Sequence, residues 1–104
     1  MSTDALDDAG PTLERAVVVL RGMAYEHRLH ILMLLRGGER TTADLAEMIS
    51  ADATAIAHHL RFLKDARLIR RQRRGRNVFY TLHGEATRQL VAEVLRYAEN
   101  STRG

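Results

Sequence analysis

The sequence predicts a mainly α-helical domain with one small β-hairpin (α+β). Three observations support this class. Apolar residues recur at helical spacing up to about residue 66, the pattern then becomes strand-like, and a last helical segment follows. At 104 residues the chain has room for one hydrophobic core. With two Phe, three Tyr and no Trp, aliphatic side chains must fill that core.

Both ends of the chain are expected to lie outside the folded domain. Residues 1–11 are acidic, with three Asp and no basic residue among the first eight, and we predict a disordered tail there. Pro11 closes this tail, because its fixed φ suits the first turn of a helix. The domain is expected to span residues 12–100, and residues 101–104 form a second tail.

Four helices are expected before the hairpin. The second helix ends at the Gly37-Gly38 pair, Thr41 or Thr42 caps the third, and Asp52 caps the fourth. The first, second and fourth helices span about residues 12–23, 26–36 and 53–66, and the short third helix ends near residue 49. Two short helices separated by a break of a few residues have the form of a helix-turn-helix.

A basic hairpin follows the fourth helix. Leu68-Ile69 leads its first strand, residues 77–82 form the second, and the turn contains Gly75. Six arginines and no acidic residue lie between Arg67 and Arg76. Such a hairpin beside a helix-turn-helix is a wing, and the order of elements predicts a winged helix-turn-helix. A final helix is expected over about residues 85–100.

The positive charge of the hairpin predicts a polyanionic partner. The arginines nearest its turn, Arg73, Arg74 and Arg76, are expected to neutralise DNA phosphates. We therefore expect the chain to bind double-stranded operator DNA.

The first and last helices both carry an apolar stripe that the helix-turn-helix and the wing are not expected to cover. These stripes consist of Leu13, Val17 and Leu20 on the first helix and Leu90, Val94 and Leu95 on the last. Packing them across a two-fold axis buries them, and it presents two reading helices about one DNA turn apart. The sequence thus predicts a homodimer.

Four stretches of the chain, in this order, carry a family resemblance. They are Met-Ala-Tyr-Glu-His-Arg-Leu at 23–29 with Ile31-Leu32, Asp-Leu-Ala at 44–46, Ala-His-His-Leu-Arg-Phe-Leu at 57–63, and Gly75-Arg76 with Val-Phe-Tyr-Thr-Leu at 78–82. With the flanking helices they cover roughly residues 13–100, and the chain resembles the ArsR/SmtB family of dimeric winged-helix regulators. The resemblance implies that the fourth helix enters the major groove. The matching reading positions are Ala53, Thr54, Ala57 and His58, with Arg61 nearby.

Members of this family commonly respond to a metal ion or another inducer. The chain has no Cys, which excludes a thiolate site. The resemblance also places the usual carboxylate and histidine ligand positions on Gly84, Ala86, Tyr97 and Asn100, which do not supply that set. The remaining candidate ligands are His27, His30, His83, Glu85 and Glu99. Because cysteine thiolate is absent, a nickel or zinc ion is the leading candidate. A non-metal input is the alternative, and ordinary surface roles for His27 and His30 stay open.

Two rival functions are considered. We predict no enzyme, because the chain has no Cys, three Ser, no phosphate-binding glycine loop and no HExxH motif. A protein-interaction module that lost DNA binding is the second alternative, against which the arginine-rich hairpin argues. The start lacks a signal peptide, and the apolar run from Ile31 to Leu35 is too short to cross a bilayer, so we expect a cytoplasmic protein without membrane partners.

Overall fold

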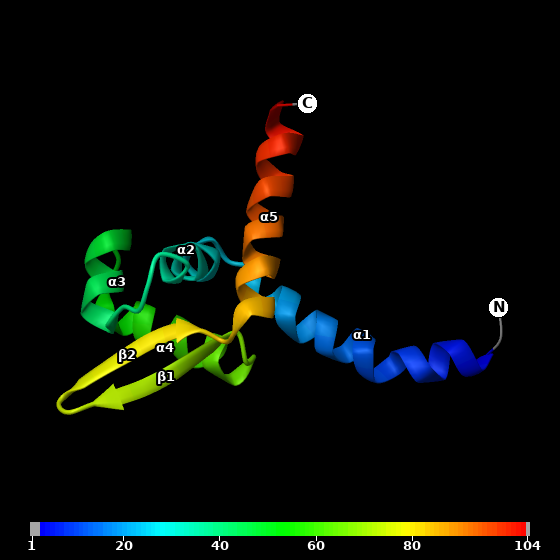
Figure 1. The fold of residues 1–104 in the computed structure, drawn as a ribbon, viewed down its shortest axis with the longest axis horizontal. Coiled ribbons are helices and arrows are strands. Elements are labelled where there is room, and N and C mark those ends of the chain that lie inside the picture. The colour runs from blue at the N-terminus through cyan, green and yellow to red at the C-terminus, as the bar shows by residue number, and fades with distance from the viewer. Residues whose placement is uncertain (1–2, 104) are drawn as a thin grey trace.

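The computed structural model describes residues 3–103, and the side chains of residues 9–102. In this part of the chain the elements follow in the predicted order. They are α1 (Thr3–Met23), α2 (Glu26–Leu35), α3 (Thr42–Ile49), α4 (Ala53–Asp65), β1 (Ile69–Arg74), β2 (Asn77–Leu82) and α5 (Glu85–Arg103). Figure 1 shows a body made of α2, α3, α4 and the hairpin, from which α1 and the far end of α5 project.

An aliphatic core holds this body together. Its fully buried side chains are Ile31, Leu32, Leu35, Leu45, Ile56, Leu60, Leu63, Ile69 and Val91. They come from α2, α3, α4, the start of β1 and the first half of α5, so every one of these elements contributes to the core. Burying one such side chain stabilises the fold by roughly 1.5–3 kcal/mol.

Side-chain caps fix the two helices of the helix-turn-helix. The Asp44 amide donates to Thr41 Oγ1 at 3.1 Å, and the Thr41 amide donates to Asp44 Oδ2 at 3.0 Å, which completes a capping box at the start of α3. Asp52 Oδ2 accepts from the Ala55 amide at 3.3 Å and caps α4. Ser50 ends α3 in the left-handed conformation, at a φ of 60°. The predicted caps at Thr41 and Asp52 are confirmed.

The hairpin is a two-stranded antiparallel ribbon whose register runs from Ile69 opposite Leu82 to Arg74 opposite Asn77. Gly75 supplies the positive φ, 64°, that the tight turn requires. The loop before α3 pairs with the outer edge of the ribbon. There the Arg40 amide donates to the Tyr80 carbonyl at 3.1 Å, and the Tyr80 amide donates to the Arg40 carbonyl at 2.8 Å.

The two terminal helices are longer than expected. α1 begins at Thr3 where we predict a disordered tail over residues 1–11, and Pro11 lies inside the helix and not in its first turn. Proline removes only one backbone hydrogen bond, while Ala5, Leu6 and Ala9 before it favour helix. α5 continues to Arg103, through most of the second predicted tail. Residues 1, 2 and 104 lie outside the described residues.

Candidate DNA-binding surface

The outward face of α4 carries the predicted reading residues. The inward face is buried through Ile56, Leu60 and Leu63, at spacings of four and three residues. The opposite face is exposed, and it comprises Thr54, Ala57, His58 and Arg61. The structure therefore brings these four residues together on one solvent-facing stripe. Lys64 is also exposed, and it extends the stripe by one turn. The sequence analysis missed it, although its spacing of three from Arg61 is a usable signal.

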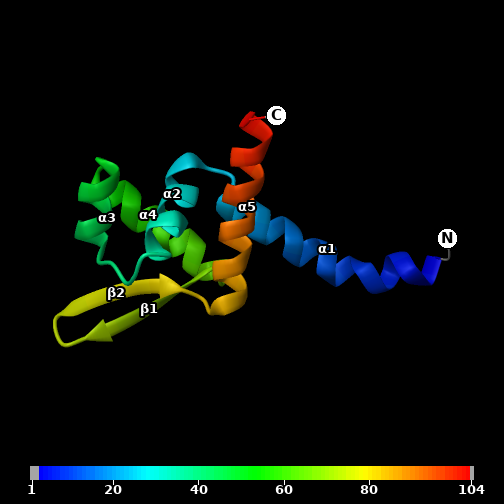
Figure 2. The same cartoon turned by 45° about the horizontal axis from the view of Figure 1, so that its top comes forward.

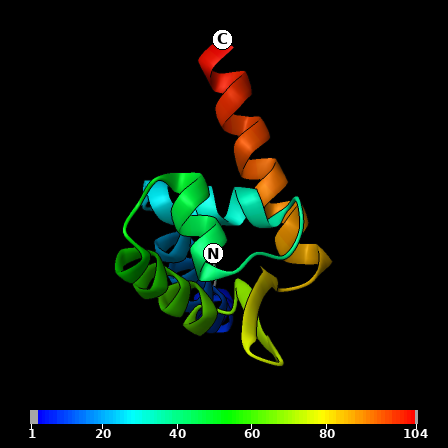
Figure 3. The ribbon, with the colours of Figure 1, turned by 90° about the vertical axis from the view of Figure 1, so that its left-hand side faces the viewer.

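The hairpin, which we call the wing, lies on the same side of the body as α4, away from the C-terminal end of α5 (Figures 1 and 3). Its register places Arg71 and Arg73 on one face of the ribbon, and Arg70 and Arg74 on the other. Every arginine from residue 70 to residue 76 is exposed. A helix face and a cationic ribbon are thus presented to the solvent together.

The three arginines at the tip of the wing differ in their surroundings. Arg74 forms an ion pair with Glu39, from the loop before α3, and its guanidinium lies 4.2 Å from the centre of the Phe79 ring. The side chains of Arg73 and Arg76 form no hydrogen bond or ion pair with any residue whose side chain the structure describes. Arg73 and Arg76 are therefore available to an external anion, whereas Arg74 already has an internal partner.

The predicted dimer stripe on α1 is uncovered within one chain. Leu13 is 58% exposed and Leu20 is 63% exposed. Figure 2 shows α1 and α5 extending from the body in separate directions. On α5, Leu90 is exposed, but Val94 and Leu95 are half-buried against the chain's own core. Tyr97 is 77% exposed, and the sequence analysis did not select it.

The comparisons with known proteins identify the family. Residues 26–71 match the family described as "Bacterial regulatory protein, arsR family". The chain is 36% identical over 88 residues to the HTH-type transcriptional regulator KmtR of Mycobacterium tuberculosis, and the match covers 85% of this chain and 68% of that protein. The chain belongs to the ArsR family.

Two further similarities support this assignment. The HTH-type transcriptional regulator NmtR of Mycobacterium tuberculosis is 36% identical over 81 residues, covering 78% of this chain and 68% of that protein. The solution structure of the homodimeric winged helix-turn-helix DNA-binding domain Mb0332 from Mycobacterium bovis superimposes with a TM-score of 0.84 at 30% identity, covering 89% of this chain and 86% of that one. The winged helix-turn-helix fold is confirmed, and this ArsR-family chain is a transcriptional regulator and not an enzyme.

Within the part of the chain that the structure describes, the candidate metal ligands of this ArsR-family chain do not form a three-residue site. His27 lines a hollow with Tyr25 and His59, and His30 lines a second hollow with Met33 and Leu95. Glu26 borders both hollows. Among the described residues, no three His, Cys, Asp or Glu side chains are arranged to hold a metal ion.

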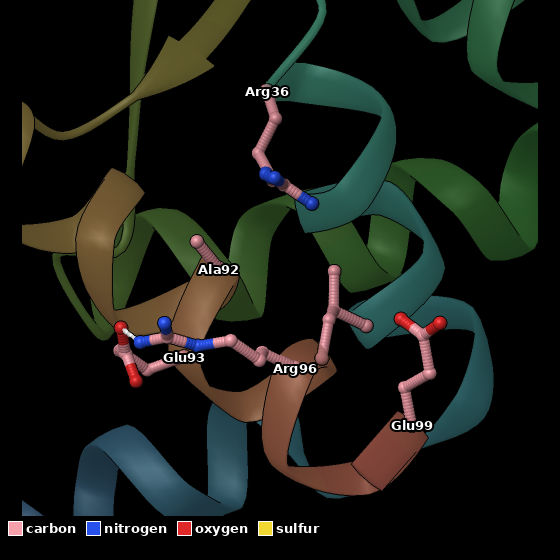
Figure 4. A pocket seen from close by; sticks show the side chains of 6 residues that line it. Arg36, Ala92, Glu93, Arg96 and Glu99 are labelled. Atoms are coloured by element: carbon pink, nitrogen blue, oxygen red, sulfur yellow. Dashed lines mark hydrogen bonds and ion pairs between the residues drawn. The ribbon is translucent and has the colours of Figure 1, made fainter.

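Of the three candidates on or beside α5, Glu99 lies far from the other two. His83 and Glu85 lie at its start, and the helical rise places Glu99 about 21 Å from Glu85. Figure 4 shows Glu99 at a hollow that Arg36 and Arg96 also line.

Within the described part of the chain, no helix is long and apolar enough to cross a membrane.

His59 lies on the side of α4 that packs against α2. Its Nδ1 accepts a hydrogen bond from Arg28 Nε at 3.3 Å, and its ring lies edge-on to that of His27, 5.8 Å between centres. Burial lowers the pKa of His59, and the positive charge of Arg28 lowers it further. The neutral form of His59 is therefore the one that fits the contact between α2 and α4.

Proposed function

We propose that this chain is a homodimeric regulator that binds operator DNA in the cytoplasm, with α4 in the major groove and the tip of the wing on the phosphate backbone. One observation carries the proposal. The exposed stripe lies on α4, Arg73 and Arg76 are exposed at the tip of the wing without an ion pair to any described residue, and α4 and the wing lie on the same side of the body (Figures 1 and 3). A helix that reads bases and a cationic ribbon that holds phosphates are the two parts that such recognition needs.

The exposed stripe of α4 can read bases, although it offers only a few polar side chains for this. Thr54, His58 and Arg61 can exchange hydrogen bonds with base edges, and the Ala57 methyl group can contact the methyl group of thymine. The wing arginines add affinity that does not depend on sequence, because they neutralise phosphates and release counterions. Base preference is therefore expected to rest on α4, and salt dependence mainly on the wing.

Dimerisation is supported by the uncovered apolar side chains of α1. Leu13, Val17 and Leu20 share one helical face, and all three are exposed in a single chain. A second copy of the chain can cover this face across a two-fold axis, which also pairs the two copies of α4 for a palindromic operator. The homodimeric Mb0332 domain is consistent with this arrangement.

The test is a gel-shift titration of the full chain on its own promoter DNA at two salt concentrations. Two chains per site, with an affinity that falls steeply as salt rises, would support the proposal. Equal binding to promoter and unrelated DNA would remove the sequence-specific part. No binding at low salt would favour the protein-interaction module instead.

The inducer to which this regulator responds stays a prediction, and a nickel or zinc ion is the leading candidate. Because no three of the candidate ligands meet among the described residues of one chain, we expect a three-ligand site to need residues of a second chain. The test is calorimetric titration of the protein with Ni²⁺ or Zn²⁺ at about pH 7 and again at about pH 5.5, where protonated histidines bind metal less well. Saturable heat that weakens at low pH would support a metal input, and no heat with either ion would favour a non-metal input.

A further inference from the structure

A hollow of about 360 Å³ lies between α4, α2 and the end of α1. It is lined by Arg21 from the end of α1, Ala24 and Tyr25 from the turn between α1 and α2, Arg28 from α2, and Phe62 from α4. Its volume falls in the range of small-molecule sites. It is separate from the outward face of α4, because Phe62 is half-buried and lies on the side that packs against α2.

Arg28 is a buried cation without a carboxylate partner. Its exposed fraction is 6%, and no described residue forms an ion pair with it. The guanidinium lies between two aromatic rings, 3.6 Å from the centre of the Phe62 ring and 4.4 Å from that of Tyr25. A buried charge is usually balanced by an opposite charge, since desolvation disfavours it. Here the two aromatic rings offset only part of the free-energy cost of burying the Arg28 guanidinium.

The hydrogen bonds of Arg28 leave part of its guanidinium unused. Nε donates to His59 Nδ1 at 3.3 Å, and Nη1 donates to the Arg21 carbonyl at 3.1 Å. Nη2 donates to no described residue, and it is not among the fully buried polar atoms without a partner. The Nη2 group is thus accessible. Arg21, an exposed residue that also lines the hollow, carries a second guanidinium, and the lining contains no acidic residue.

We propose that this hollow binds a small aromatic carboxylate. Two guanidinium groups favour a carboxylate, which they can hold through charge-assisted hydrogen bonds. The rings of Tyr25 and Phe62 offer apolar surface against which a flat ring packs. The hollow is large enough for a one-ring acid such as benzoate.

Binding at this hollow is expected to alter α4. Arg28 joins α2 to α4 through the Phe62 ring and the hydrogen bond to His59. A carboxylate that draws the guanidinium into the hollow competes with that hydrogen bond and changes how α4 packs on α2. The hollow therefore acts as an effector site. This consequence rests on the proposed function, whereas the binding itself does not.

The site is tested without DNA by titrating the full chain with sodium benzoate at constant ionic strength and following its backbone amide NMR signals. We expect saturable shifts in α2 and α4, with a dissociation constant of about 1 mM or tighter. Benzamide, which has nearly the same shape and no charge, should bind at least about tenfold more weakly, since a charge-assisted contact is lost. The absence of saturable shifts, or equal binding of benzamide, would overturn the site.

A matched pair of variants localises the binding. Arg21→Gln keeps the backbone carbonyl that accepts from Arg28, so the fold is retained, and it should weaken benzoate binding about tenfold. Arg36→Gln makes the same change just beyond the other end of α2 and should leave binding unchanged. Equal effects of the two variants would mean that benzoate responds to net charge and not to this hollow.

The regulatory consequence is tested by repeating the promoter titration with saturating benzoate. The DNA dissociation constant should change at least about threefold in the unmodified chain and stay constant in Arg21→Gln. Benzoate binding without this change would overturn the coupling to α4 but not the site. Failure of the chain to bind DNA at all would overturn the proposed function instead, since benzoate binding is measured separately.

Discussion

Replacing Arg73 and Arg76 with Ala should lower the salt dependence of DNA binding. Both side chains are exposed at the tip of the wing, without an ion pair to any described residue, so each is available for one phosphate. A dimer then makes four such contacts. Each contact contributes about 0.9 to the slope of log K against log salt, so the slope should fall by about 3.6.

This slope predicts a difference that is easily measured. Salt can be doubled, for example from about 0.1 M to about 0.2 M. The factor by which the unmodified chain then loses affinity should be roughly twelve times the factor for the double variant. The variant should also bind promoter and unrelated DNA more weakly by similar factors, because phosphates carry no sequence information. Arg74→Ala is the matched comparison and should have a smaller effect, since Glu39 already neutralises Arg74.

The assay is fluorescence anisotropy of labelled promoter DNA at four or more salt concentrations. An unchanged slope in the double variant would refute the reasoning, because it would remove the tip of the wing from the phosphate backbone. A larger change in slope for Arg74→Ala than for the double variant would refute it as well. That result would show that the pair with Glu39 opens on DNA.

Three other perturbations test the fold, the half-buried His59 and the dimer. Gly22→Val should lower the free energy of unfolding in urea by about 1–3 kcal/mol, because a Cβ at position 22 lies 2.7 Å from Leu68 Cδ1 in the core. For His59, burial and then the charge of the neighbouring guanidinium lower the pKa, so the unfolded chain takes up this proton first. The stability due to neutral His59 is present above the unfolded pKa of 6.5 and is lost as the pH falls through the folded pKa. His59→Gln should therefore reduce the loss of stability between about pH 7.5 and about pH 5.5. Leu20→Glu should yield monomers in sedimentation equilibrium and weaken DNA binding, because it places a charge in the apolar stripe of α1.

Each of these predictions has a matched control. Gly10→Val introduces the same side chain where no atom lies within 4 Å, and equal losses at both glycines would rule out overpacking at position 22. His83→Gln changes an exposed histidine, and an equal effect there would show that burial of His59 is unimportant. Arg15→Glu adds a carboxylate on the opposite side of α1, and a dimer that survives Leu20→Glu would place the interface elsewhere.

Local chemistry explains why much of the fold could be predicted from the sequence. The caps at Thr41 and Asp52 satisfy amides only three residues away, and the hairpin turn depends on the glycine within it. The exposed face of α4 follows from helical spacing alone. The start of α1 was predicted wrongly, because proline favours the first turn of a helix but also occurs inside one.

The missed features depend on residues that are distant in sequence. Glu39 and Arg74 are 35 residues apart, and their pairing requires the wing to fold back onto the loop before α3. Arg28 lies in a helical segment with other polar residues, and its burial appears only once α4 lies against α2. The candidate metal ligands are His and Glu residues of suitable chemistry, but among the described residues no three of them are arranged to hold a metal ion, which spacing along the chain does not reveal.

The main-chain pairing of Arg40 with Tyr80 has a consequence for how this regulator can evolve. It joins the wing to the segment that leads into α3 through backbone atoms, which every substitution except that by proline leaves in place. The position of the wing relative to the start of α3 is thus set by the main chain. If α4 and the wing bind DNA as proposed, residues exposed on α4 and β1 can diverge to suit new operators while this main-chain pairing stays constant.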